Sequence, residues 1–118
     1  MYIQIMRIEI RKKNGKEAIL ISFDTVRKRF KSASERNRFY WELHGRKQVV
    51  IKKRKRYVYQ RKGVLGITPH IKVSNSVFIV AVENRKRVMD FFDKWEEKIE
   101  LKTFPVILDK KEMKEVED

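Results

Sequence analysis

The sequence predicts a small single α+β domain, with a mostly antiparallel sheet and two helices. Three observations carry this prediction: an Asn14-Gly15 turn between two β-branched segments, an apolar helical stripe over 85–99, and a run apolar on both faces at 77–82. The 118 residues, 42% of them hydrophobic, can build one modest core. We expect a domain at 1–108 with a basic first half at 1–62, a near-neutral second half at 63–108, and an acidic flexible tail at 109–118.

The N-terminal region is predicted to form a β-hairpin. Both central residues of a type I′ turn need positive φ, which Asn14 and Gly15 tolerate. This turn sets the register of residues 2–10 against the next strand. It places six apolar side chains on one face, pairing Ile10 with Ile19, Ile8 with Ile21 and Met6 with Phe23.

The next elements are a short basic segment and a capped helix. Residues 26–31 fit a third short strand, although their apolar spacing could also open a helix. Ser32 and Glu35 have the spacing of a capping box, which predicts a helix over 34–44 that ends at Gly45. Its apolar face is formed by Phe39, Tyr40 and Leu43.

Residues 48–62 are strand-like, and a loop with two glycines and Pro69 follows them. The second half of the domain, after this strand, contains the clearest helical pattern. The run at 77–82 suits a central strand. A helix is expected over 85–99, with its apolar stripe at Val88, Phe91, Phe92, Trp95 and Ile99. A last strand at 101–108 contains Pro105, which predicts an edge or a bulge.

Charge is unevenly distributed along the chain. Lys and Arg number 30 against 16 Asp and Glu, a net charge of +14. Residues 1–62 hold 20 of these cations and 5 carboxylates, whereas 63–118 hold 10 and 11. A basic excess confined to one half indicates a binding face for a polyanion, whereas evenly spread charge would serve solubility.

Composition disfavours several other classes of protein. No apolar run approaches about 18 residues, so neither a transmembrane helix nor a membrane partner is expected. The absence of cysteine excludes disulfides, a thiolate zinc site and a cysteine nucleophile. The first residues lack the pattern of a secretory signal, so we expect a cytoplasmic protein. The excess of Lys, Arg and Glu is typical of proteins from hyperthermophiles.

The most informative stretch is 46–62, in which nine of 17 residues are basic and none is acidic. Such cations bind phosphates, because the counterions that phosphates release drive binding. Tyr57 and Tyr59 lie two apart on a predicted strand, so both project from one face and could stack on bases. Alternatively, both tyrosines are core residues and the basic run is a solvated hairpin tip. The cations are Arg46, Lys47, Lys52, Lys53, Arg54, Lys55, Arg56, Arg61 and Lys62.

A second basic cluster surrounds the start of the helix at 34–44. Cations together with the free N–H groups of a helix N-terminus can hold phosphate, and ordinary surface charge around a helix cap is an equal alternative. Residues 39–41 are three consecutive aromatics that one helix face cannot bury together, and Trp41 is the one expected to be exposed. The cluster comprises Arg27, Lys28, Arg29, Lys31, Arg36 and Arg38.

Signals for catalysis are poor. His44 and His70 are the only histidines, and neither has metal-ligand spacing to a carboxylate pair, so we expect no catalytic residue, metal or cofactor. At the end of its helix, a protonated His44 would complement the helix dipole. The charge pattern therefore favours a small basic nucleic-acid-binding protein without enzymatic activity.

RNA is the preferred ligand, as in a ribonucleoprotein or ribosome-associated component, because a basic strand with tyrosines suits stacking and no recognition helix is evident. The alternatives are a DNA-binding accessory or regulatory protein and a scaffold that meets an acidic protein. The near-neutral second half, with its aromatic helix, could dock a protein partner. A further alternative is a metal-independent RNase of toxin type, with candidate residues His70, Tyr57, Tyr59 and Arg61.

Overall fold

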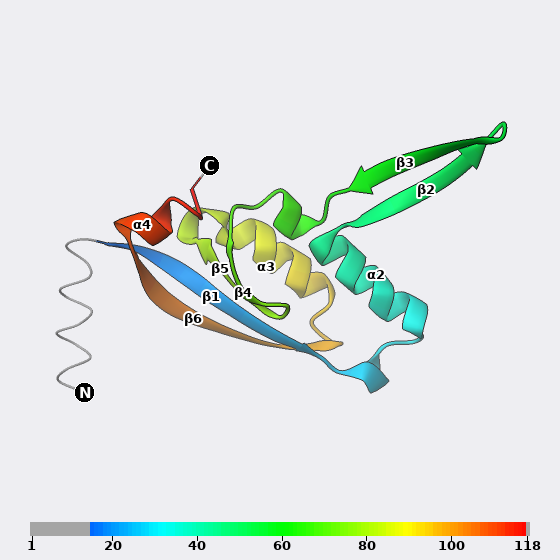
Figure 1. Cartoon of the computed structure of the whole chain (residues 1–118). Coiled ribbons are helices and arrows are strands. Elements are labelled where there is room, and N and C mark those ends of the chain that lie inside the picture. The colour runs from blue at the N-terminus through cyan, green and yellow to red at the C-terminus, as the bar shows by residue number, and fades with distance from the viewer. Residues whose placement is uncertain (1–14, 118) are drawn as a thin grey trace.

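The computed structural model describes residues 15–117, which form six antiparallel strands in two sheets, three α-helices and three 3₁₀ turns (Figure 1). The elements are β1 (Gly15–Thr25), η1 (Arg27–Arg29), α2 (Ala33–His44), β2 (Arg46–Lys52), β3 (Lys55–Arg61), η2 (Val64–Gly66), β4 (Ile71–Ser74), β5 (Val77–Ala81), η3 (Val82–Asn84), α3 (Arg85–Lys94), β6 (Ile99–Asp109) and α4 (Lys110–Met113). The predicted α+β class with an antiparallel sheet is confirmed. We term residues 46–62 the arm and the remaining described residues the body.

β1 lies inside the four-stranded sheet of the body, whose order is β4-β5-β1-β6. Ile21 faces Phe78 of β5 on one side and Thr103 of β6 on the other, and Ile19 is enclosed in the same way. The predicted partner segment 2–10 lies outside the described residues. Because both edges of β1 are occupied, the predicted pairing of Ile19 and Ile21 with that segment is wrong.

One face of the sheet is covered by α2 and α3 and holds the main core. The Phe23 ring of β1 lies 5.5 Å from Phe39 of α2 and 5.4 Å from Phe92 of α3, between ring centroids. Trp95 is buried against Phe39, with ring centroids 5.4 Å apart. The predicted apolar faces of the two helices are confirmed, since this core contains Phe39, Tyr40, Leu43, Val88, Phe91, Phe92 and Trp95.

The opposite face of the sheet is covered by the C-terminal segment. The α4 helix begins with a capping box, in which the Asp109 carboxylate accepts the Glu112 N–H at 2.8 Å and the Glu112 carboxylate accepts the Asp109 N–H at 3.1 Å. Val116 is only 1% exposed. The predicted flexible tail at 109–118 is therefore wrong over its described residues, because this cap and a buried cluster fix it. That cluster consists of Ala18, Ala81, Leu108 and Val116.

The segment at 26–31 forms a 3₁₀ turn and neither of the predicted elements. The Arg29 N–H donates to the Val26 carbonyl at 2.9 Å, which closes the turn. The turn brings the Phe30 ring into the core beside Phe39. Burial of the Phe30 ring therefore explains the backbone path of this mainly basic segment.

The predicted helix at 85–99 ends early, at Lys94. The chain turns after Trp95, whose carbonyl accepts the Lys98 N–H at 2.9 Å, and Ile99 then begins β6. Ile99 is still buried, but from a strand. Pro105 lies in β6 at the edge of the sheet, as predicted.

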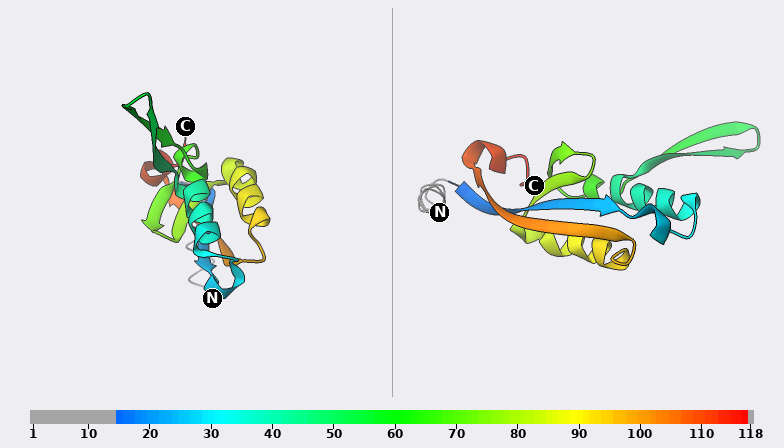
Figure 2. Two further views of the ribbon diagram at one scale, coloured as in Figure 1. Left: turned by 90° about the vertical axis from the view of Figure 1, so that its right-hand side faces the viewer. Right: turned by 90° about the horizontal axis from the view of Figure 1, so that it is seen from below.

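The arm is a two-stranded sheet of its own that follows the end of α2. Each strand has seven residues, or about 23 Å at the usual rise per residue. Figure 2 shows the arm reaching beyond the end of the body, without a helix over either face. The described residues accordingly span 65 × 33 × 21 Å. A lone two-stranded hairpin is at best marginally stable in water, so burial does not account for the arm.

Candidate nucleic-acid interface

The arm carries dense positive charge without neutralising carboxylates. All nine of its Lys and Arg side chains belong to exposed residues. The ion pairs found within residues 15–117 use Lys16, Arg38, Lys86 and Lys98 as their cations, and none of these lies in the arm. Like charges at this density repel one another, and a ligand rich in phosphates would relieve that repulsion.

The two faces of the arm differ in chemistry, because directly opposite residues of a hairpin point to the same side. One side, which we term the tyrosine face, displays Arg46, Gln48, Val50, Lys52, Lys55, Tyr57, Tyr59 and Arg61. The other side, the aliphatic face, displays Lys47, Val49, Ile51, Arg56, Val58 and Gln60. The arm therefore places both tyrosines and four cations on one surface.

The tyrosine face is organised by contacts between its cations and its rings. Tyr57 and Tyr59 are 41% and 42% exposed, so the alternative that they are core residues is wrong. The Arg61 guanidinium lies 5.4 Å from the Tyr59 ring centroid, and its Nε donates to the Gln48 side-chain oxygen at 2.8 Å. The amide thus holds the cation against the ring, an arrangement typical of cation–π contacts.

Trp41 extends this surface from the arm onto α2. Its side chain is exposed, as predicted. The Arg46 guanidinium carbon lies 4.0 Å from the Trp41 ring centroid. Arg46 is the direct cross-strand partner of Arg61. Two neighbouring arginines at the root of the arm therefore each lie against an aromatic ring.

The tip of the arm is a two-residue turn made by two cations. Lys53 and Arg54 have φ angles of 50° and 65°, the left-handed values that glycine and asparagine adopt most easily in type I′ turns. Placing other residues there costs about 1–2 kcal/mol each. The tip thus tolerates backbone strain at the two positions where the arm projects furthest, and both side chains are positive.

The root of the arm depends on two glycines in close contact. Gly45 ends α2 with a φ of 87°, and a Cβ there would lie 2.5 Å from the Arg61 carbonyl oxygen. A Cβ on Gly63 would lie 2.4 Å from the Gly45 nitrogen. The entering and leaving strands of the arm are therefore packed backbone against backbone on the end of α2. Sequence reasoning took Gly63 for an ordinary loop residue, and no local signal reveals this contact.

The second basic cluster lies at the other end of α2 and is divided. Arg27 and Arg36 line one small hollow of about 170 Å³ beside the helix start. Arg38 belongs to a different groove, which also contains Lys94 and Lys98. At 1.5 Å per residue, the twelve-residue helix is about 18 Å long, and its full length lies between the arm and the cations that precede the helix; Arg36 and Arg38 lie within its first half. The structure does not merge the two predicted clusters into one surface.

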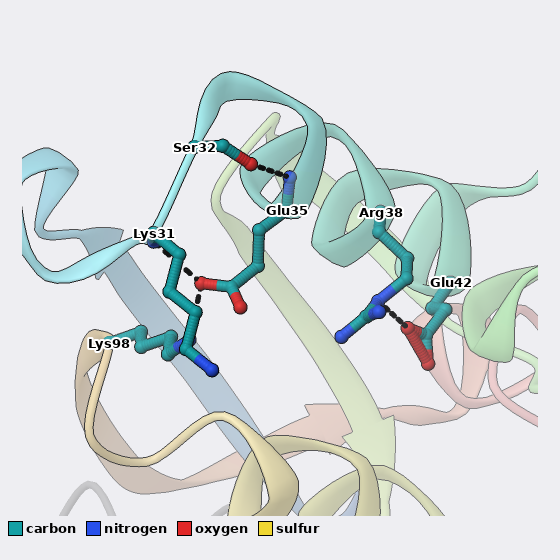
Figure 3. A network of polar contacts seen from close by, with 6 residues as sticks. All are labelled: Lys31, Ser32, Glu35, Arg38, Glu42 and Lys98. Carbon is teal, nitrogen blue, oxygen red and sulfur yellow. Dashed lines mark hydrogen bonds and ion pairs between the residues drawn. The ribbon is translucent and has the colours of Figure 1, made fainter.

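Carboxylates also interleave with the second cluster, as Figure 3 shows. The Ser32 hydroxyl accepts the Glu35 N–H at 3.1 Å, and the Glu35 carboxylate accepts the Lys31 N–H at 2.9 Å. Glu35 also pairs with Lys98. The hydrogen bond from Lys98, followed by the bond from the Lys31 N–H, lowers the pKa of the Glu35 carboxyl below its ordinary value. Arg38 lies 3.7 Å from Glu42. These partners reduce the charge available for a ligand, in contrast to the arm.

The two histidines differ in their surroundings. Desolvation and then the nearby charges of Lys72 and His70 lower the pKa of His44, so the predicted protonated imidazole is disfavoured. The His70 Nδ1 lies 2.8 Å from the Thr68 carbonyl oxygen. No contact seen within residues 15–117 joins His70 to Arg61 or to the tyrosines, which are the other candidates for an RNase.

Three further features of the molecule bear on function. In the described part of the chain, no group of three His, Asp or Glu side chains could hold a metal ion. Among the same residues, no helix has the length and apolar character needed to cross a membrane. The aromatic stripe of α3, which belongs to the second half that could dock a protein partner, is buried in the core. Its rings are therefore not free to bind a partner.

Comparison with known proteins adds no assignment, because no family model, curated protein or solved structure matches the chain.

Proposed function

We propose that the protein binds nucleic acid through its arm, whose Lys and Arg side chains contact backbone phosphates. One observation carries the proposal: nine exposed cations, none of which pairs with a carboxylate of residues 15–117, lie on a hairpin that projects from the body. Phosphates spaced along a polymer can engage several of these cations at once. The resulting release of counterions supplies the free energy of binding.

RNA is the favoured ligand. Exposed tyrosines beside arginines suit unpaired bases, which RNA offers in its loops, bulges and ends. A ribonucleoprotein component is the setting that fits such a binder, and a cytoplasmic location is part of the same proposal.

Duplex DNA is the second candidate, and the shape of the arm favours it. A lone two-stranded ribbon is narrow enough to enter the major groove of B-DNA, whereas the major groove of A-form RNA is too deep and narrow for side chains to read. In that case the protein would be a DNA-binding accessory or regulatory factor.

Charge reversal in the arm tests the proposal. With about five to eight cations at phosphates, the slope of log K against log salt should be roughly −4 to −7. Lys53→Glu with Lys55→Glu should weaken binding to all sequences alike and flatten that slope by about two units. The matched control is Lys110→Glu with Lys111→Glu on α4, at the opposite end of the molecule (Figure 1). Equal losses in the two variants would contradict the localisation of binding to the arm.

A further inference from the structure

We propose that the tyrosine face and Trp41 together form a stacking track for a single-stranded segment of nucleic acid. This inference rests on the proposed function and narrows the ligand from nucleic acid in general to single strands. It also adds Trp41, a residue of α2, to a surface otherwise formed by the arm. The track runs along one side of β3 and continues past the root of the arm.

The spacing of the rings suits successive bases. Tyr57 and Tyr59 project from the same side of β3, about 6.6 Å apart along the strand. Each ring is about two-fifths exposed, although a hairpin of this kind could have buried both against a body. Separated, outward-facing rings along a strand are typical of sites on which neighbouring bases stack one by one.

The cations of the same side complete the track. Arg61 lies against Tyr59 and Arg46 lies against Trp41, so each of these rings has a guanidinium beside it. Guanidinium planes also stack on bases, and their N–H groups can reach the phosphates of the same nucleotides. Lys52 and Lys55 continue the charge toward the tip. A backbone could therefore follow the cations while its bases meet the rings.

The aliphatic face lacks every one of these features except charge. It carries Val49, Ile51 and Val58, which are 47%, 74% and 57% exposed, and it has no aromatic ring. A duplex hides the flat surfaces of its bases, so the rings would contribute nothing to duplex binding. The presence of both rings of the arm on one side is therefore the reason to favour a single strand.

Intrinsic fluorescence provides a direct test, because the chain has only two tryptophans and they differ in exposure. Trp41 is 42% exposed, whereas Trp95 is 5% exposed and lies in the core. Titration with a short oligouridine should quench the emission of the wild-type protein. Trp41→Phe should abolish the quenching, because the remaining tryptophan, Trp95, lies in the core, while anisotropy of a labelled strand measures the affinity of each protein independently of tryptophan emission. An oligothymidine and a duplex of the same length complete the set of probes.

Variants of the two faces sharpen the test. Tyr57→Ala, Tyr59→Ala and Trp41→Ala should each weaken single-strand binding about 5- to 150-fold and leave the salt slope nearly unchanged. Val49→Ala and Val58→Ala are the matched controls on the aliphatic face and should leave the affinity unchanged. Circular dichroism of each variant verifies that the fold is intact.

The failures of the two proposals are distinguishable. If anisotropy detects no binding of oligouridine, oligothymidine or duplex, the proposed function itself is wrong. If all three bind equally, without quenching and without loss in the ring variants, phosphate binding stands and the stacking track is overturned. A preference for duplex would likewise overturn the track and favour the second candidate ligand.

Discussion

The body and the arm are built from similar residues that serve opposite purposes. In the body, Phe39 is fully buried and lies within 6.3 Å, between ring centroids, of six other aromatic rings. In the arm, Ile51 is 74% exposed and neither tyrosine is buried. Burial of apolar side chains therefore accounts for the stability of the body, whereas it contributes little to the stability of the arm. The contrast indicates that the residues that stabilise the fold and the residues of the proposed binding site occupy separate regions of this chain.

Charge follows the same division. Four cations of the body have carboxylate partners, among them Lys86 with Asp90 at 2.8 Å and Lys98 with Glu35. The arm has no acidic residue at all. Exposed pairs contribute little stability, so the pairing in the body matters chiefly because it lowers the local positive field. The arm is the stretch with nine cations and no carboxylate of its own.

The largest expected effect separates the two regions by stability. Phe39→Ala should lower the free energy of unfolding by roughly 3–5 kcal/mol, because it leaves a cavity among packed rings. Ile51→Ala removes an exposed side chain and should change it by less than about 0.5 kcal/mol. Urea denaturation of both variants measures the difference. A similar cost in both would show that the arm is part of the folded core.

Substitutions in the turn of the arm should have a smaller effect on stability, and the effect should be stabilising. Lys53→Asn with Arg54→Gly places residues suited to positive φ at both turn positions and should stabilise the hairpin by about 1–2 kcal/mol. The same change removes two cations, so binding should weaken and the salt slope should flatten. Amide hydrogen exchange of Lys52 and Lys55 reports the hairpin, and titration with labelled RNA reports the affinity. Tighter binding in the more stable hairpin would refute the claim that tip charge is functional.

The smallest effect concerns pH and the body alone. Because the pKa of Glu35 is lower in the folded state, its pairing with Lys98 stabilises the protein above the unfolded pKa. This contribution should be lost as the pH falls below about 4.3, the ordinary value for glutamate. Glu35→Gln should flatten that part of the curve of unfolding free energy against pH. If the unfolding free energy fell equally with decreasing pH in the wild type and in Glu35→Gln, the proposed contribution of the Glu35–Lys98 pair would be wrong.

Local patterns in the sequence predicted the elements whose determinants lie close together. The Ser32 cap and Gly45 bound α2 as expected, and Pro105 lies at a sheet edge. Strand pairing was not predictable in this way. The turn signal at Asn14 and Gly15 cannot reveal that two apolar strands from the second half take both edges of β1.

The candidate site was partly predictable for the same reason. The charge of the arm follows from composition, and the common side of Tyr57 and Tyr59 follows from the two-residue period of a strand. The turn at Lys53 and Arg54 contains neither glycine nor asparagine, so the sequence offers no signal for it. The contact between the root glycines depends on the backbone of a neighbouring helix, so only the structure reveals it.

Excision of the arm tests the division between body and arm most directly. Arg46 and Arg61 are opposite each other, so replacing residues 47–60 by Asn-Gly leaves them flanking a two-residue turn. Thermal unfolding and RNA binding are then measured on the same sample. We predict a midpoint close to that of the wild-type protein and no detectable binding at physiological salt. Retained binding, or a body that no longer folds, would contradict the account.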